Sequence, residues 1–102
     1  MTRSDLLEAA KEIVTKDRTT DYGTPENNFK TIAELWTTYL GVPISTHQVP
    51  ILMALLKIAR LKQSPAHTDS LIDLAGYAAC AAEVAPLPVG AAFMTPSIGG
   101  QP

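Results

Sequence analysis

Two cations and two carboxylates flank a short turn between two expected helices. Lys57 and Arg60 are three residues apart, so they share a face of the first helix. Asp69, Asp73 and Tyr77 follow at intervals of four and form a polar stripe on the second helix. Because a short connection makes neighbouring helices antiparallel, counting outward from the turn places Arg60 level with Asp69. The same count places Lys57 level with Asp73, and we expect either a salt-bridge network or a ligand site here.

A second group of polar residues lies in the segment 16–26, where a glycine, a proline and a lack of apolar periodicity predict a loop. Arg18 suits a phosphate group, because its planar guanidinium donates two parallel hydrogen bonds. Tyr22 offers a flat ring to a base and a hydroxyl to a phosphate oxygen, and Asp21 lies beside it. The segment is therefore either a solvated turn or a loop that contacts a ligand.

The acidic residues leave two chemical interpretations open. If they face a pocket, Glu26, Asp69 and Asp73 could hold Mg²⁺, which prefers oxygen ligands, while the cations bind phosphate. Without a metal, the aspartates would accept hydrogen bonds from ribose hydroxyls or base amines. His67 is either a surface residue or a further phosphate donor. Catalytic residues are unknown, since no glycine-rich phosphate loop, zinc-ligand spacing or Ser/His/Asp arrangement is visible.

Composition restricts the class of protein. The 102 residues predict one domain, and a hydrophobic content of 46% excludes a disordered chain. Aromatic residues make up only 6%, which favours closely packed helices over a β-sandwich. A net charge of −2 argues against a surface for duplex nucleic acid but permits a local phosphate pocket. No signal peptide or membrane-length apolar run is present, so we expect a cytoplasmic protein, with Cys80 buried as a small hydrophobic residue.

The apolar spacing predicts an all-α fold, a four-helix antiparallel bundle-like domain over residues 1–85 with a Pro/Gly-rich tail or arm over 86–102. The expected helices run from a cap at Thr2 or Ser4 to Lys16, from a cap at Thr24 to Gly41, from Ser45 or Thr46 to the turn, and from a cap at Thr68 to Val84.

The third expected helix is apolar nearly all round. Three other helices in so small a chain do not cover such a circumference, so we expect a homo-oligomer. The fourth helix is rich in alanine and contains Gly76, which costs up to ~1 kcal/mol relative to alanine inside a helix. Close approach of a neighbouring helix is the expected reason for this glycine.

These residues resemble a group of short, poorly characterised proteins of bacteriophages and prophages, over about residues 4–83. The resemblance is carried by the runs DRTTDYGTPENNFKTIAELWTTYLG, LLKIARL and HTDSLIDLAGYAA. It implies a protein of the cytoplasm of a bacterial host. Some small phage proteins have nucleotide pockets without chemistry and sequester host defence signals, and that class fits the residues here as well as an enzyme does.

More remotely, the acidic helix of the hairpin is similar to the all-α nucleotide pyrophosphohydrolases of the MazG type, which are oligomers that hydrolyse nucleoside triphosphates with Mg²⁺. Their first acidic motif, Glu-Glu-x-x-Glu, corresponds to the start of the second helix, where only Glu26 matches a carboxylate. Their second motif is Glu-x-x-Asp, whereas Asp69 and Asp73 are one residue further apart. Two or three acids thus remain where four are usual.

Three hypotheses follow. The first is a protein that binds a phosphorylated or cyclic nucleotide, using the cations for phosphate and Tyr22, Asp69 and Asp73 for base, ribose or metal. The second is a Mg²⁺-dependent nucleotide pyrophosphohydrolase with Glu26, Asp69 and Asp73 as metal ligands. The third is a structural helical oligomer in which the hairpin charges only bind one another.

Overall fold

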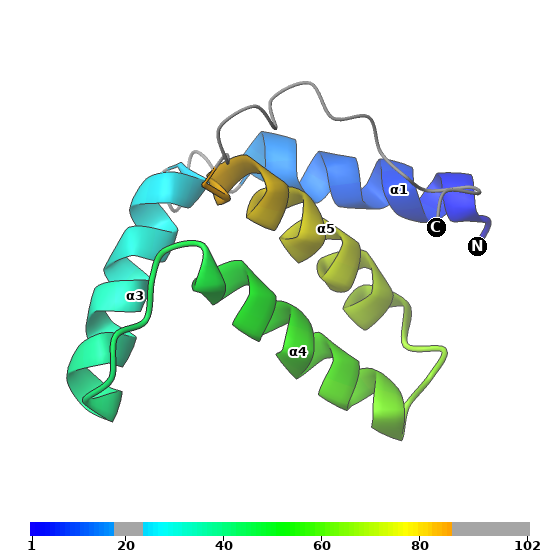
Figure 1. Ribbon diagram of the computed structural model, residues 1–102. Helices are drawn as coiled ribbons and strands as arrows, with labels where there is room; N and C mark the ends of the chain where they lie inside the picture. Colours follow the sequence, from blue (N-terminus) through cyan, green and yellow to red (C-terminus); the bar gives the residue numbers. More distant parts are fainter. Residues whose placement is uncertain (18–23, 87–102) are drawn as a thin grey trace, which may run out of the picture.

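The computed structural model describes residues 1–17 and 24–86, and this part of the chain is all-helical, with no strand (Figure 1). Its elements are α1 (Arg3–Glu12), the π-helical turn η1 (Ile13–Asp17), α3 (Pro25–Leu40), α4 (Gln48–Gln63) and α5 (Thr68–Val84). The predicted all-α class and the four α-helices are confirmed. No helix in these ranges combines the length and hydropathy needed to cross a bilayer.

The helix starts follow from local sequence. Thr2 begins α1 with a capping box, in which its hydroxyl accepts from the Asp5 N–H at 3.1 Å and the Asp5 carboxylate accepts from the Thr2 N–H at 3.0 Å. Thr24 caps α3 by accepting from the Asn27 N–H, and Pro25 occupies the first helical position, where no N–H is needed. Thr2 and Thr24 were therefore predicted correctly as caps.

The connection between α3 and α4 is held by side chains from both of its ends. Gly41 ends α3 with a φ of 73°, the left-handed conformation that glycine adopts without strain. The Thr37 hydroxyl then accepts from the Ile44 N–H at 2.8 Å. The Gln48 side chain accepts from both the backbone N–H and the hydroxyl of Ser45. These bonds fix where α4 begins, two or three residues later than the sequence predicted.

Helices α4 and α5 form an antiparallel hairpin, and α1 lies across α5 (Figure 1). Helix α3 does not align with them. It stands at a steep angle and meets the other helices where α4 begins and α5 ends. The predicted hairpin is confirmed, whereas the predicted four-helix antiparallel bundle-like arrangement is not confirmed.

The core lies at the junction of α3, the start of α4 and the second half of α5. Four buried side chains form its centre, Phe29, Ala33, Val49 and Cys80. Val14 of η1 packs against this centre and also lies 3.2 Å from the position that a Cβ would take at Gly76. The expected close approach at Gly76 and the burial of Cys80 are thus confirmed. The junction fixes η1 and the start of α3, the two segments that flank residues 18–23, against α5.

Candidate functional site at the α4–α5 hairpin

One ion pair joins the two helices of the hairpin. The Lys57 ammonium lies 2.9 Å from a carboxylate oxygen of Asp73, and the side chains are 13% and 24% exposed. This pair sits in the seam between α4 and α5, because Lys57 shares the α5-facing side of α4 with Val49 and Met53. Lys57 and Asp73 lie at the same level of the hairpin, as predicted. Their charges neutralise each other in this ion pair.

The second pair of a salt-bridge network, between Arg60 and Asp69, does not form in the described part of the chain. Arg60 and Asp69 are both exposed, and in the described part of the chain no ion pair joins them. The reason is helical geometry. Arg60 follows Lys57 by three residues, which rotates it by about 60° around the helix axis, so both cannot point at α5 equally. In the described part of the chain the salt-bridge network therefore includes Lys57 and Asp73 but not Arg60 and Asp69, and Arg60 is exposed to solvent.

His67 has a defined structural role that the sequence argument missed. Its Nδ1 accepts from the Ser70 N–H at 3.2 Å and lies 2.7 Å from the Ser70 hydroxyl oxygen, so His67 is the N-cap of α5. The predicted cap at Thr68 is wrong by one residue. Because Nδ1 accepts the backbone N–H, the other ring nitrogen, Nε2, carries the proton and remains able to donate to a ligand. Ser70 itself is 1% exposed, and its spacing of three from His67 was the available signal.

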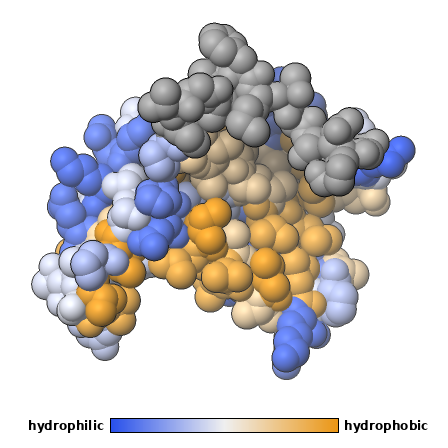
Figure 2. All heavy atoms as spheres, viewed as in Figure 1, coloured by the Kyte–Doolittle hydropathy of each residue, from blue (hydrophilic) through white to orange (hydrophobic). Residues whose placement is uncertain are grey.

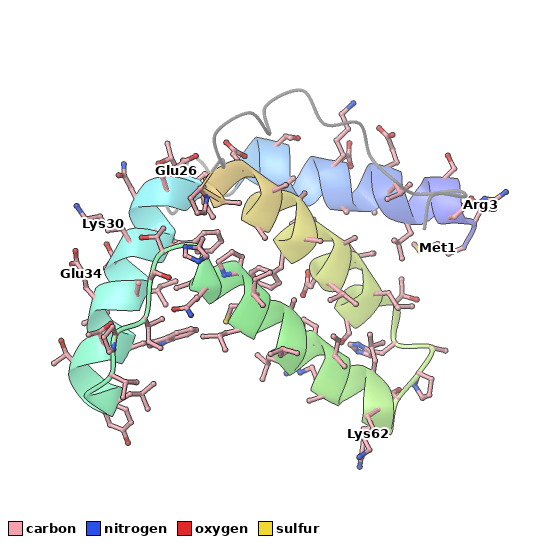
Figure 3. The ribbon with its side chains drawn as sticks, viewed as in Figure 1. Met1, Arg3, Glu26, Lys30, Glu34 and Lys62 are labelled. Atoms are coloured by element: carbon pink, nitrogen blue, oxygen red, sulfur yellow. The ribbon has the colours of Figure 1, made fainter. Side chains whose placement is uncertain are left out.

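The remaining candidate residues occupy three different places. Tyr77 is half-buried and packs against the core one turn after Asp73. Glu26 lies in the first turn of α3, beside the end of α5, whereas Asp69 lies in the first turn of α5 (Figure 3). Arg18, Asp21 and Tyr22 lie outside the described residues.

The metal hypothesis requires Glu26, Asp69 and Asp73 to converge. In α5, Asp69 precedes the core residue Cys80 by eleven positions, or about 16 Å along the helix. Glu26 is close to the Cys80 end, so a single chain does not bring the three carboxylates together. Within the described ranges there is also no group of three histidine, cysteine or acidic side chains placed to hold a metal ion.

Comparison with known proteins identifies the family of this chain. A family model described as "Domain of unknown function (DUF6378)" matches residues 5–85. The chain belongs to this family. It is 44% identical over 84 residues to the Gene 55 protein of Mycobacterium phage D29, covering 82% of this chain and 56% of that protein. It is 42% identical over 74 residues to the Gene 55 protein of Mycobacterium phage L5, covering 72% and 47%.

The chain spans about half the length of these curated relatives. No solved structure matches it. The predicted membership of a short, uncharacterised phage family is confirmed by the family model and the two phage relatives. The names of these relatives describe no activity, so function has to be argued from the hairpin itself.

Proposed function

We propose that this protein binds a phosphorylated nucleotide, linear or cyclic, beside the α4–α5 hairpin. The observation that supports the proposal most directly is the position of Arg60. Its guanidinium is exposed, forms no ion pair with Asp69, and follows the Lys57–Asp73 pair by one helical turn. A guanidinium in that position is suited to bidentate binding of a phosphate group.

The neighbouring groups supply the other contacts that a nucleotide needs. The Lys57 ammonium has three donors, so binding to Asp73 leaves others for a phosphate oxygen. The exposed Asp69 carboxylate is suited to ribose hydroxyls or base amines. His67 adds the Nε2–H donor. In this proposal Asp73 contacts the nucleotide only through Lys57, and Tyr77 supports the packing below it.

Arg18, Asp21 and Tyr22, which lie outside the described residues, also belong to the proposed site. The segments before and after them are fixed to α5, since Val14 reaches Gly76 and Phe29 packs with Cys80. In the proposal Arg18 binds phosphate and Tyr22 stacks on the base, with Asp21 beside it.

Membership of a phage family favours sequestration as the purpose of such binding. A phage protein that holds a nucleotide signal without converting it would lower the free concentration of that signal in the host cell. We propose this anti-defence role in preference to hydrolysis, because the carboxylates needed for a Mg²⁺ site do not converge in one chain.

The test is thermal shift and calorimetry with a panel of nucleoside mono- and triphosphates and cyclic mono- and dinucleotides, with and without Mg²⁺. Arg60→Ala should abolish the response to the nucleotide that binds. Lys62→Ala is the matched control, because it removes a positive charge two residues later, about 200° further around the helix axis, from the side chain labelled at the end of α4 (Figure 3). Equal effects of the two substitutions, or no response to any nucleotide, would contradict the proposal.

Two alternatives remain distinguishable in the same experiment. Release of pyrophosphate or phosphate that is lost in Asp69→Asn and Asp73→Asn would identify a pyrophosphohydrolase, its site completed between subunits. The second alternative, a structural helical oligomer without a ligand, is favoured by the Lys57–Asp73 pair and by the exposed aliphatic side chains of α4. It predicts no binding and no turnover with every nucleotide.

A further inference from the structure

The outer face of α4 is apolar and uncovered. Five aliphatic side chains on it are between 38% and 54% exposed, and they are Ile51, Leu52, Leu55, Leu56 and Ile58. Ile51, Leu55 and Ile58 lie on the side of the helix opposite to Met53 and Lys57, which face the core and α5, and Leu52 and Leu56 lie along one edge of that side. Figure 2 shows hydrophobic atoms gathered over α4 on the viewed face. We call this set of five the outer α4 face.

Helix α3 extends the apolar surface. Its first turns enter the core through Phe29 and Ala33, but its second half diverges from α4. Four large hydrophobic residues there and just beyond are more than half exposed, Leu35, Tyr39, Leu40 and Val42. Hydrophobic atoms are also visible at this end of α3 in Figure 2, on the same side of the molecule as those of α4.

The area of this surface is of the size that a stable dimer needs. At about 32 Å² per aliphatic carbon, the exposed parts of the outer α4 face amount to roughly 310 Å². The four residues of α3 and its end add roughly 380 Å² by the same estimate, with the ring of Tyr39 counted at about 200 Å². The outer α4 face alone is as large as the largest patch of a typical monomer, and together with the residues of α3 it approaches the ~800 Å² that each partner contributes to a standard interface.

We propose that a second copy of this chain covers the outer α4 face, with the two α4 helices antiparallel across a two-fold axis near Leu55. The inference deepens the homo-oligomer expectation and does not depend on nucleotide binding. A two-fold contact places the same surface on both subunits, so apolar residues meet apolar residues without a second, different patch.

Charge decides the orientation of the two helices. The last turn of α4 carries Arg60 and Lys62, and its first turn has no acidic residue. A parallel pair would place these cations against their copies and align two helix dipoles. In an antiparallel pair centred on Leu55, Lys62 lies near the neutral Gln48 of the partner subunit, and the dipoles oppose. Leu55 lies midway between Gln48 and Lys62, in the middle of the outer α4 face.

The first experiment is sedimentation equilibrium of the 102-residue chain. We expect a mass twice the 10.9 kDa of one chain. Leu55→Glu should raise the dissociation constant of the dimer by roughly 100-fold or more, because two carboxylates would face each other in an apolar contact. Leu7→Glu is the matched control, since Leu7 is 63% exposed on α1, outside the proposed interface. Circular dichroism checks that both variants remain helical.

The second experiment tests the axis. Leu55→Cys should form a disulfide-linked dimer under mild oxidation, because a residue at a two-fold axis meets its own copy. The unsubstituted chain, whose Cys80 is buried, should not be linked. Linking of Leu7→Cys to the same extent would overturn the assignment of the axis.

Three results would overturn the proposal. They are a monomer at 100 µM chain, an oligomer whose mass Leu55→Glu leaves unchanged, and a monomer that dimerises only after removal of residues 87–102. The last result would assign the outer α4 face to the chain's own tail. Nucleotide binding is read separately by the Arg60→Ala and Lys62→Ala pair, so either proposal can fail while the other stands.

Discussion

The interaction between Lys57 and Asp73 can be measured with a double-mutant cycle. Lys57→Met and Asp73→Asn each keep a side chain of similar shape and remove one charge, and the double variant removes both. The pair is 2.9 Å apart and only 13% and 24% exposed, so it lies between a surface ion pair and a buried one. The cycle isolates the free energy of the pair from the cost of leaving one charge alone.

The expected magnitude follows from that intermediate burial. Two unit charges about 4 Å apart attract by about 1 kcal/mol in water and about 4 kcal/mol at the effective dielectric constant near a protein surface. Desolvation and the ordering of a long lysine side chain offset most of this. We therefore expect a coupling free energy of about 1 kcal/mol, and a loss of about 1–2 kcal/mol for each single substitution.

The assay is urea unfolding followed by circular dichroism at a single, fixed protein concentration, because dimer formation would otherwise shift the stability. A coupling below about 0.3 kcal/mol would refute the view that Lys57 and Asp73 hold the hairpin in register. A phosphate-binding readout separates structure from function. If Lys57 contributes to a phosphate site, Lys57→Met weakens nucleotide binding beyond its effect on stability, and a purely structural pair leaves the binding affinity unchanged.

Two further predictions concern the core and the first helix. Val49 is 0% exposed, so Val49→Ala should lower the free energy of unfolding by about 2–3 kcal/mol, whereas Val42→Ala, at a 51% exposed site, should change it by less than about 0.5 kcal/mol in urea unfolding. Hydrogen bonds from the backbone and hydroxyl of Thr2 lower the pKa of Asp5 below its usual 3.8. The resulting stabilisation of α1 is present above pH 3.8 and lost as pH falls through the lowered pKa, and an NMR titration of the Asp5 carboxyl with a midpoint at or above 3.8 would contradict this.

Local sequence signals predicted the helices well and their arrangement less well. Thr2, Thr24, Pro25 and Gly41 act through bonds or backbone angles within a few residues, so their roles could be identified without tertiary structure. The angle of α3 could not. It depends on how Phe29 and the start of α4 meet the core and on the hydrogen bonds of the α3–α4 connection. These are contacts between segments whose relative positions no local pattern specifies.

The hairpin charges show where counting along the sequence stops being informative. The register alone correctly predicted that Lys57 and Asp73 lie at the same level. Their side chains meet because they lie on the facing sides of two antiparallel helices. Register also placed Arg60 level with Asp69, but being level along the axis does not make two side chains face each other. Arg60 is rotated by about 60° from Lys57 around α4, towards solvent.

The absence of an Arg60–Asp69 pair leaves a guanidinium available at the edge of the hairpin, next to a cation that is already held in place. A cluster in which every charge was paired would offer an incoming phosphate fewer donors and less net positive charge, so Arg60, which is unpaired within the described part of the chain, is the feature that makes a ligand site here physically reasonable. Arg60→Ala is for that reason the most informative single substitution in this chain.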